Sequence, residues 1–377
     1  MFFEIKDICV RTISLKIIEE SFFEIERTNQ VRERLSQTPS FSVTMQRRTK
    51  LFRRLLSSAA RVRRITKLST FALCLGIVLV YKIFPANTIR LEYPEPSVAV
   101  VSAARAIFAK DGRQFIYISF INSAYVQYTQ SWLCNLALLR GDVLNNLLLI
   151  VDSETTKQKL SHFLPDAQVQ VYAIKLPGAV SYGYVSYFYL TAVRLHVQNI
   201  LIQQGISVFV VESDAAWFAD DVDEILLEHF KKFDVVSQPN YNGKLYDTHE
   251  PQICAGFSGY IAKPHIKRFF NEYVDMYKAE LASASLRAKR GYVGDASPGE
   301  QVLLSSLTEK SSIAVGWLHF CDFATGIWYT DNNYRSNCKP KVIQNNFISG
   351  LDAKIARARA FGHWFLEDGR CRLFMTA

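Results

Sequence analysis

Short apolar runs alternate with longer stretches of helical periodicity through the middle of the chain, and this alternation restricts the fold more than any other feature. The runs are rich in β-branched and aromatic residues and predict five strands, at 114–121, 146–151, 169–175, 208–211 and 234–237. Helices are predicted between them, near 125–139, 153–163, 185–203 and 221–231. Such alternation indicates a mostly parallel sheet with helices on both faces. The fold class is therefore α/β, with ligands expected beyond the carboxyl ends of the strands.

The pattern becomes less regular after Pro251. It predicts an apolar segment at 253–262, a helix at 264–288, a glycine-rich loop at 291–299 and a helix at 299–307. We expect one domain, because no internal repeat or low-complexity tract divides this part of the chain. Aromatic residues are dense at 182–189, and we assign them to the core, apart from Tyr182 beside a loop.

The net charge of +9 is concentrated ahead of one apolar segment. Lys and Arg number 44 and Asp and Glu 35, but nine of the basic residues lie at 47–67, where no acidic residue occurs. The rest of the chain is neutral and offers no basic tract to nucleic acid. Residues 68–84 follow directly, and these 17 residues are long enough to cross a thin bilayer as a helix.

Basic residues flank membrane-spanning helices on the cytosolic side. We therefore expect a single-pass type II protein of the Golgi membrane with a cytosolic basic tail at 1–67, a signal anchor at 68–84, a stem at 85–112 and a lumenal domain at 113–377. A cleaved signal peptide and a buried core helix are the alternatives to the anchor. The long basic N-terminal region disfavours both. Residues 1–44 are either a cytosolic tail or an extension upstream of a start at Met45.

Five cysteines lie on the predicted lumenal side and allow at most two disulfides. We expect one among the three nearest the C-terminus, Cys321, Cys338 and Cys371, although spacing does not determine connectivity. The cysteines show no Cys-x-x-Cys or Cys/His zinc spacing.

Two carboxylates one residue apart, Glu212 and Asp214, follow the predicted strand at 208–211. The period of two along a strand places them on the same side, where the sheet opens to ligand. Two like charges this close favour a shared cation, and Mg²⁺ or Mn²⁺ prefers such oxygen ligands. The alternative is that these acidic residues only cap the helix at 221–231.

Four segments, taken in order, carry a wider pattern. They are Arg194 with the helix leading to Gly205 and the block 208–217, the Ala-Gly-Phe segment at 253–264, Pro-Gly-Glu-Gln at 298–301, and 342–350 followed by Lys354, Arg357 and Trp364. Together they resemble the nucleotide-diphospho-sugar transferase domain of glycosyltransferase family seventy-seven, found in Golgi type II enzymes. The resemblance spans roughly residues 114–365. It implies a GT-A-like, Rossmann-type fold, a sugar-nucleotide donor, a glycan or glycoprotein acceptor, and retention of configuration.

The resemblance also implies roles for residues around the nucleotide and the metal. Asp214 would hold Mn²⁺ or Mg²⁺, Glu212 would share the metal or accept from the ribose, and Gln344 would complete the coordination. Asn122, at the end of the first strand, would contact the nucleotide. Arg194 would offset diphosphate charge, a role that suits its fixed fork of donors. A solvated helix position is the alternative for Arg194.

Four more residues would surround the transferred sugar and the diphosphate. Glu300 and Gln301 would face the sugar hydroxyls as catalytic residues, and Gly256 would let the backbone approach the donor sugar. Lys354 would meet the diphosphate from the opposite side. The alternatives are a strand bulge at Gly256 and an ordinary surface ion pair at Lys354.

Three polar positions depart from the family pattern. Glu212 stands where the family has the first Asp, Glu300 replaces the Asp before Gln, and Gln344 replaces a His that commonly completes metal coordination. An amide carbonyl is a weaker ligand than imidazole.

We therefore expect a metal-assisted glycosyltransferase that acts on a lumenal acceptor. The first alternative is a weak or inactive Golgi-resident binding protein on the same fold, motivated by the three substitutions. The second is a polyanion-binding factor that uses the basic tract at 47–67.

Overall fold

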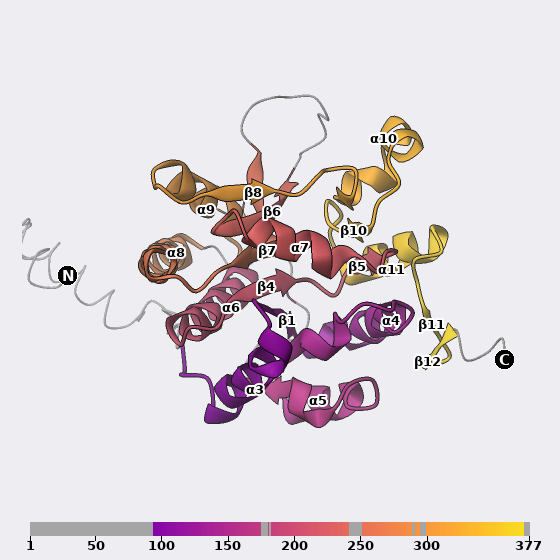
Figure 1. Ribbon diagram of the computed structural model, residues 1–377, viewed down its shortest axis with the longest axis horizontal. Helices are drawn as coiled ribbons and strands as arrows, with labels where there is room; N and C mark the ends of the chain where they lie inside the picture. Colours follow the sequence, from indigo (N-terminus) through magenta and orange to yellow (C-terminus); the bar gives the residue numbers. More distant parts are fainter. Residues whose placement is uncertain are drawn as a thin grey trace, which may run out of the picture. The chain divides into compact units, whose positions relative to one another are not determined.

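The computed structural model describes residues 93–174, 180, 182–240, 251–288, 291–294 and 299–372, all within one unit, Thr88–Ala377. Its central sheet has the strand order β3-β2-β1-β4-β7-β6-β8 (Figure 1). The bounds are β1 Ile116–Ile121, β2 Leu147–Val151, β3 Val169–Val171, β4 Val208–Val211, β6 Val235–Asn240, β7 Gln252–Tyr260 and β8 Val315–Trp317. Strand β7 is antiparallel to β4 and β6, whereas the other neighbours pair in parallel. The predicted α/β fold with a mostly parallel sheet is confirmed.

Helices cover both faces of this sheet (Figure 1). Side chains alternate along each strand, so neighbouring residues such as Ile116 and Tyr117 enter different cores. The first core includes buried side chains of α3 Val98–Phe108, α6 Val185–Gln203, α8 Pro264–Arg287 and α9 Glu300–Glu309. The second includes those of α4 Val126–Leu136, α5 Glu154–Leu160 and α7 Val222–Phe230. Strands buried on both faces explain why the sequence shows continuous apolar runs instead of alternation.

Helix α3 corrects the boundary expected for the stem at 85–112. Its Val100, Ala104 and Ile107 are buried in the first core, and the helix packs against β1, β2 and β3. The folded domain therefore includes this helix. Its apolar residues recur at i, i+4 and i+7, the spacing of a helix face that covers a sheet.

A second sheet, in the order β5-β10-β9, lies beyond the end of β4. Its strands are β5 Ala215–Trp217, β9 Phe323–Ala324 and β10 Val342–Gln344, and β10 runs antiparallel to β5. Short helices α10 Asn332–Asn337 and α11 Leu351–Ala360 accompany it, and a hairpin of β11 Leu366–Glu367 and β12 Arg370–Cys371 follows. This arrangement brings the C-terminal segment onto the residues that follow β4.

The two disulfides join Cys134 to Cys371 and Cys321 to Cys338, and Cys254 is free and buried. The pair expected within the C-terminal cluster is present, and the second pair links that cluster to α4. The predicted anchor at 68–84 lies outside the described residues. Within the part of the chain that is described, no helix has both the length and the apolar character needed to cross a membrane.

Candidate functional site

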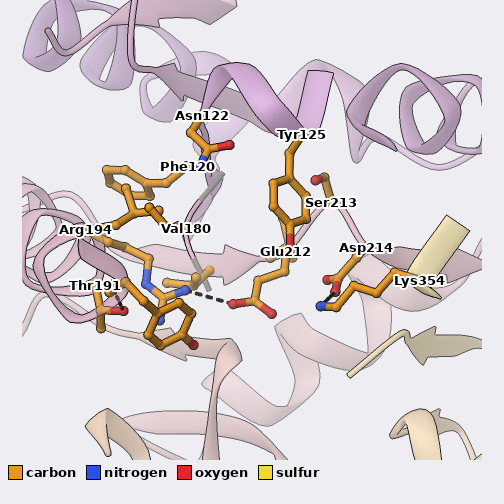
Figure 2. Close-up of a pocket in the computed structure, with 14 residues that line it drawn as sticks. Phe120, Asn122, Tyr125, Val180, Thr191, Arg194, Glu212, Ser213, Asp214 and Lys354 are labelled. Atoms are coloured by element: carbon orange, nitrogen blue, oxygen red, sulfur yellow. Dashed lines mark hydrogen bonds and ion pairs between the residues drawn. The ribbon is translucent and has the colours of Figure 1, made fainter. Parts of the chain in front are cut away.

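A pocket opens where β1 and β4 end (Figure 2). The strands are parallel neighbours, so their carboxyl ends lie at the same edge of the sheet. The residues after β1 contribute Asn122 and Tyr125, and those after β4 contribute Glu212, Ser213 and Asp214. Helix α6 closes a second wall with Tyr187, Leu190, Thr191 and Arg194, and α11 contributes Lys354. This edge is the predicted ligand-binding position of a parallel sheet.

The carboxylate of Glu212 lies between two cationic side chains in the pocket. Figure 2 shows Arg194 on one side of it and the pair formed by Asp214 and Lys354 on the other. Burial and the neighbouring Asp214 carboxylate raise the pKa of Glu212, whereas Arg194 and Lys354 oppose the rise. The two carboxylates do lie on the same side, as predicted, and each is paired with a cation from a different helix.

Arg194 joins two carboxylates from opposite parts of the sequence. Its Nη1 donates to Glu212 Oε1 at 3.0 Å, and its Nη2 donates to Glu300 Oε2. The Arg194 and Glu300 side chains are only 12% and 10% exposed. Burial acts to lower the pKa of Arg194, but Glu300 and Glu212 outweigh it and hold the pKa above its usual value. Arg194 is therefore a buried bridge, which rules out the solvated helix position.

Lys354 reaches the pocket from α11 and donates a hydrogen bond to Asp214 Oδ2. The two side chains are 16% and 5% exposed, so this is not a surface pair. Burial opposes the charge on Lys354, yet the Asp214 carboxylate and other neighbours hold its pKa above the usual value. An ammonium group at this place would compensate either the carboxylate or a bound diphosphate.

Asn122 is a buried residue whose side chain has no partner among the described residues. It is 3% exposed, and neither its Oδ1 nor its Nδ2 makes a hydrogen bond within the described ranges. Buried polar groups are nearly always hydrogen-bonded. Because Asn122 lines the pocket, its free donor and acceptor are available to a ligand there. The structure thus places this predicted nucleotide-binding residue at the pocket.

Gly256 lies against a carboxylate of the site, whereas the predicted Glu300 and Gln301 are not among the residues that line the pocket, and Glu300 reaches it through Arg194. A Cβ on Gly256 would come 2.5 Å from Glu212 Cδ, so only glycine leaves room for the carboxylate. Gln301 follows Glu300 in the first turn of α9, and its buried Oε1 makes no hydrogen bond to any described residue. Gly256 therefore makes room for a pocket side chain, and it also lies in the irregular stretch of β7 between Ile253 and Ser258, where the register with β6 shifts.

The predicted role of Gln344 as a metal ligand is not supported by its contacts. Gln344 is 1% exposed, and its Oε1 accepts from Cys254 Sγ at 3.0 Å and from Asn346 Nδ2 at 3.2 Å. Burial raises the pKa of Cys254 to about 12, so its thiol keeps the proton that it donates. A carbonyl oxygen accepts two hydrogen bonds, and both positions are taken. Gln344 is thus a buried residue bound to Cys254 and Asn346, and it does not line the pocket.

The two carboxylates remain a fitting pair for a divalent cation. Each keeps acceptor positions beyond the bond to its own cation. Mg²⁺ commonly binds one or two carboxylates together with substrate phosphates, without a complete protein cage. Within the described ranges, no three His, Cys, Asp or Glu side chains are grouped so that they could hold a metal ion by themselves. Glu212 and Asp214 are thus the candidate ligands.

Sequence reasoning missed two tyrosines of the pocket. Tyr125 points its hydroxyl toward Glu212 (Figure 2), and burial is the main cause that raises its pKa. Tyr187 lines the α6 wall, and burial also holds its pKa above the usual value. Tyr187 also packs against the first core, as predicted for this aromatic cluster. The position of Tyr125, three residues after Asn122 at a strand end, is the signal that would have indicated it.

The chain is similar to known proteins in sequence and in fold. Residues 142–358 match the family model described as nucleotide-diphospho-sugar transferase. The chain is 22% identical over 331 residues to UDP-D-xylose:L-fucose alpha-1,3-D-xylosyltransferase 1 of Arabidopsis thaliana, covering 80% of this chain and 86% of that protein. Similar solved structures include an active-site mutant of LgtC, with 12% identity, a TM-score of 0.41 and coverage of 67% and 97%. Another is mouse xyloside xylosyltransferase 1, with 10% identity, a TM-score of 0.38 and coverage of 63% and 99%.

Proposed function

Because the chain belongs to the nucleotide-diphospho-sugar transferase family and is a glycosyltransferase, we propose that it transfers a sugar from a nucleotide-diphosphate donor to a lumenal glycan or glycoprotein, with retention of configuration. The observation that carries this proposal is the set of charges at the ends of β1 and β4. Two carboxylates, a guanidinium and an ammonium face one pocket beside Asn122, whose amide has no hydrogen-bond partner among the described residues. Such a set suits a ligand that carries both phosphates and hydroxyls.

Different residues of the site would bind the nucleotide, the diphosphate and the sugar of the donor. Asn122 would bind the nucleotide through its free amide, and Lys354 would turn from Asp214 to the diphosphate. Arg194 would keep Glu212 and Glu300 in place while its charge favours the diphosphate. Glu300 and Gln301 would contact the hydroxyls of the donor sugar.

Glu212 and Asp214 would hold Mn²⁺ or Mg²⁺, whose chemistry is to neutralise the diphosphate as it leaves. The chain's own contribution at this step is to present both carboxylates to the pocket. Arg194 donates to Glu212 and so fixes the direction of that carboxylate, and Lys354 would leave Asp214 free for the cation as the diphosphate binds.

A nucleotide-release assay with the full chain tests the proposal. UDP-D-xylose, the donor named for the plant relative, is the first to try, with methyl α-L-fucopyranoside as acceptor and other UDP- and GDP-sugars after it. We expect release of the nucleotide in the presence of Mn²⁺ and its loss in Asp214→Asn. An absence of turnover with retained nucleotide binding would favour the inactive binding protein, which the loss of Gln344 as a ligand motivates.

We also propose that the protein is a single-pass type II membrane protein of the Golgi, anchored by residues 68–84. The tract at 47–67 and two disulfides, which persist in oxidising compartments, support this orientation. A C-terminal epitope on the full chain should resist protease in intact microsomes and become sensitive after detergent is added. A protein that carbonate extracts from the membrane would contradict the anchor.

A further inference from the structure

Three exposed tyrosines gather beside the pocket. Tyr182, Tyr184 and Tyr292 are 52%, 44% and 49% exposed, and no other tyrosine of the described ranges is as accessible. The exposure of Tyr184 corrects its assignment to the core. Large apolar surfaces left in water often mark binding sites.

The backbone holds these rings in place. Tyr184 and Tyr292 form an antiparallel bridge, Val293 N donates to Gly183 O at 2.8 Å, and the two tyrosine rings are 5.1 Å apart. Gly183 has a φ of +89°, and a Cβ there would lie 2.6 Å from Tyr292 Cε2. The Tyr292 ring thus lies directly over the Gly183 backbone, which orders the side chain before any ligand binds.

Tyr182 adjoins the pocket on the side of α6, and Tyr184, close to it in the chain, pairs with Tyr292. Tyr182 lies 5.4 Å, ring centroid to ring centroid, from Tyr187, which lines the pocket with Arg194. Arg194 in turn contacts Glu300, the residue proposed to face the donor sugar. Tyr182 therefore lies one ring away from the pocket wall that carries Arg194, and a second substrate can reach all three exposed rings from solvent.

The chemistry of the three rings favours a neutral sugar. A phenol combines an apolar ring with one polar tip, and a pyranose combines an apolar C–H face with hydroxyls around its rim. The three rings carry no charge, so they offer a phosphate no ionic partner. We propose that Tyr182, Tyr184 and Tyr292 form the acceptor site, on which a pyranose ring of the acceptor glycan stacks. This inference rests on the proposed function and names the place of its second substrate.

Saturation-transfer NMR on the full chain tests the site without requiring turnover. The probes are UDP together with methyl α-L-fucopyranoside, methyl β-D-galactopyranoside and methyl α-D-mannopyranoside. We expect saturation of the ring C–H protons of at least one pyranoside. The triple change Tyr182→Ala, Tyr184→Ala and Tyr292→Ala should weaken its binding about two- to twelvefold per lost ring contact. The matching Tyr→Phe triple should retain binding, because stacking needs the ring and not the hydroxyl.

Two controls separate the possible failures. Phe218→Ala removes another exposed aromatic residue, 42% exposed, and should leave pyranoside binding unchanged. Tyr182→Ala alone leaves Tyr292 in place, so weaker pyranoside binding in this variant cannot come from a loop disturbed at Tyr292. UDP signals without any pyranoside signal would overturn the acceptor site alone, whereas the loss of both would overturn the proposed function. A change of oligomeric state in the Tyr→Ala triple would assign the rings to contacts between chains and overturn the proposal.

Discussion

Lys354 Nζ donates a hydrogen bond to Asp214 Oδ2, and neither side chain is more than 16% exposed. The ammonium group of Lys354 is therefore bound to the same carboxylate that is expected to bind a divalent cation. A substrate diphosphate offers Lys354 a second anionic partner. Its arrival would release Asp214, so binding of nucleotide and binding of metal should favour each other.

Replacing Lys354 tests this competition. In Lys354→Met, Asp214 loses its cation, and Mn²⁺ should bind more tightly to the nucleotide-free protein, as measured by electron paramagnetic resonance. Transfer should nevertheless fall by about 10²- to 10³-fold, since one group that stabilises developing charge is lost. Lys341→Met is the matched control, because Lys341 pairs with Asp221 outside the pocket. Equal Mn²⁺ affinity in the wild type and Lys354→Met would contradict the competition.

Replacing Arg194 should destabilise the fold as well as the site. Arg194→Met leaves two carboxylates without their common cation and should lower the free energy of unfolding by about 3 kcal/mol. Adding Glu300→Gln to that variant removes one of the uncompensated charges and should restore part of the loss. Urea denaturation of the wild type, Arg194→Met, Glu300→Gln and the double variant gives the coupling energy between the two side chains. Additive effects would mean that the buried contact between Arg194 and Glu300 carries no energy.

Two glycines of β7 should respond differently to alanine. At Gly256 the new methyl group meets the carboxylate at the end of the Glu212 side chain, which can turn away, so we expect transfer to fall at least about tenfold with little change in melting temperature. At Gly259 it meets Phe209 and Phe230, each 2.4 Å away, and overpacking should cost about 1–3 kcal/mol of stability. Transfer rates and melting temperatures of Gly256→Ala and Gly259→Ala, each compared with the wild type, test this difference. Equal loss of stability in the two would show that Gly256 serves packing alone.

His363 should make stability depend on pH between about 4 and 6.5. Burial lowers the pKa of His363 to about 4, and its Nδ1 lies 2.8 Å from the Tyr329 hydroxyl. The unfolded chain takes up the proton first, so stability is lost as pH falls through this window, by at most about 1.4 kcal/mol per pH unit. His363→Asn should reduce this slope in urea titrations at pH 7 and pH 5. Identical slopes would show that other groups cause the loss.

Much of the central sheet could be predicted from local sequence. The runs at 116–121 and 208–211 are apolar apart from Ser119 because both faces of each strand are buried. The helices between them show the 3.6-residue period. Helix α3 was missed, because the prolines that precede it suggested a stem. The same local reasoning placed Asn122, Glu212 and Asp214 at strand ends, and parallel pairing brings strand ends together.

Tertiary contacts alone decided how these residues are paired. Arg194 and Glu300 are separated by 106 positions, and Asp214 and Lys354 by 140. No local pattern could therefore show which cation pairs with which carboxylate. The same holds for Gln344, whose residue type suggested a weak ligand and whose contacts with Cys254 and Asn346 show that both acceptor positions are used. The sequence by itself determined the α/β sheet and the edge at which the site lies, because periodicity and strand ends are local properties. The charge pairing and the exposed tyrosines depend on burial and on long-range packing, which only the folded chain determines.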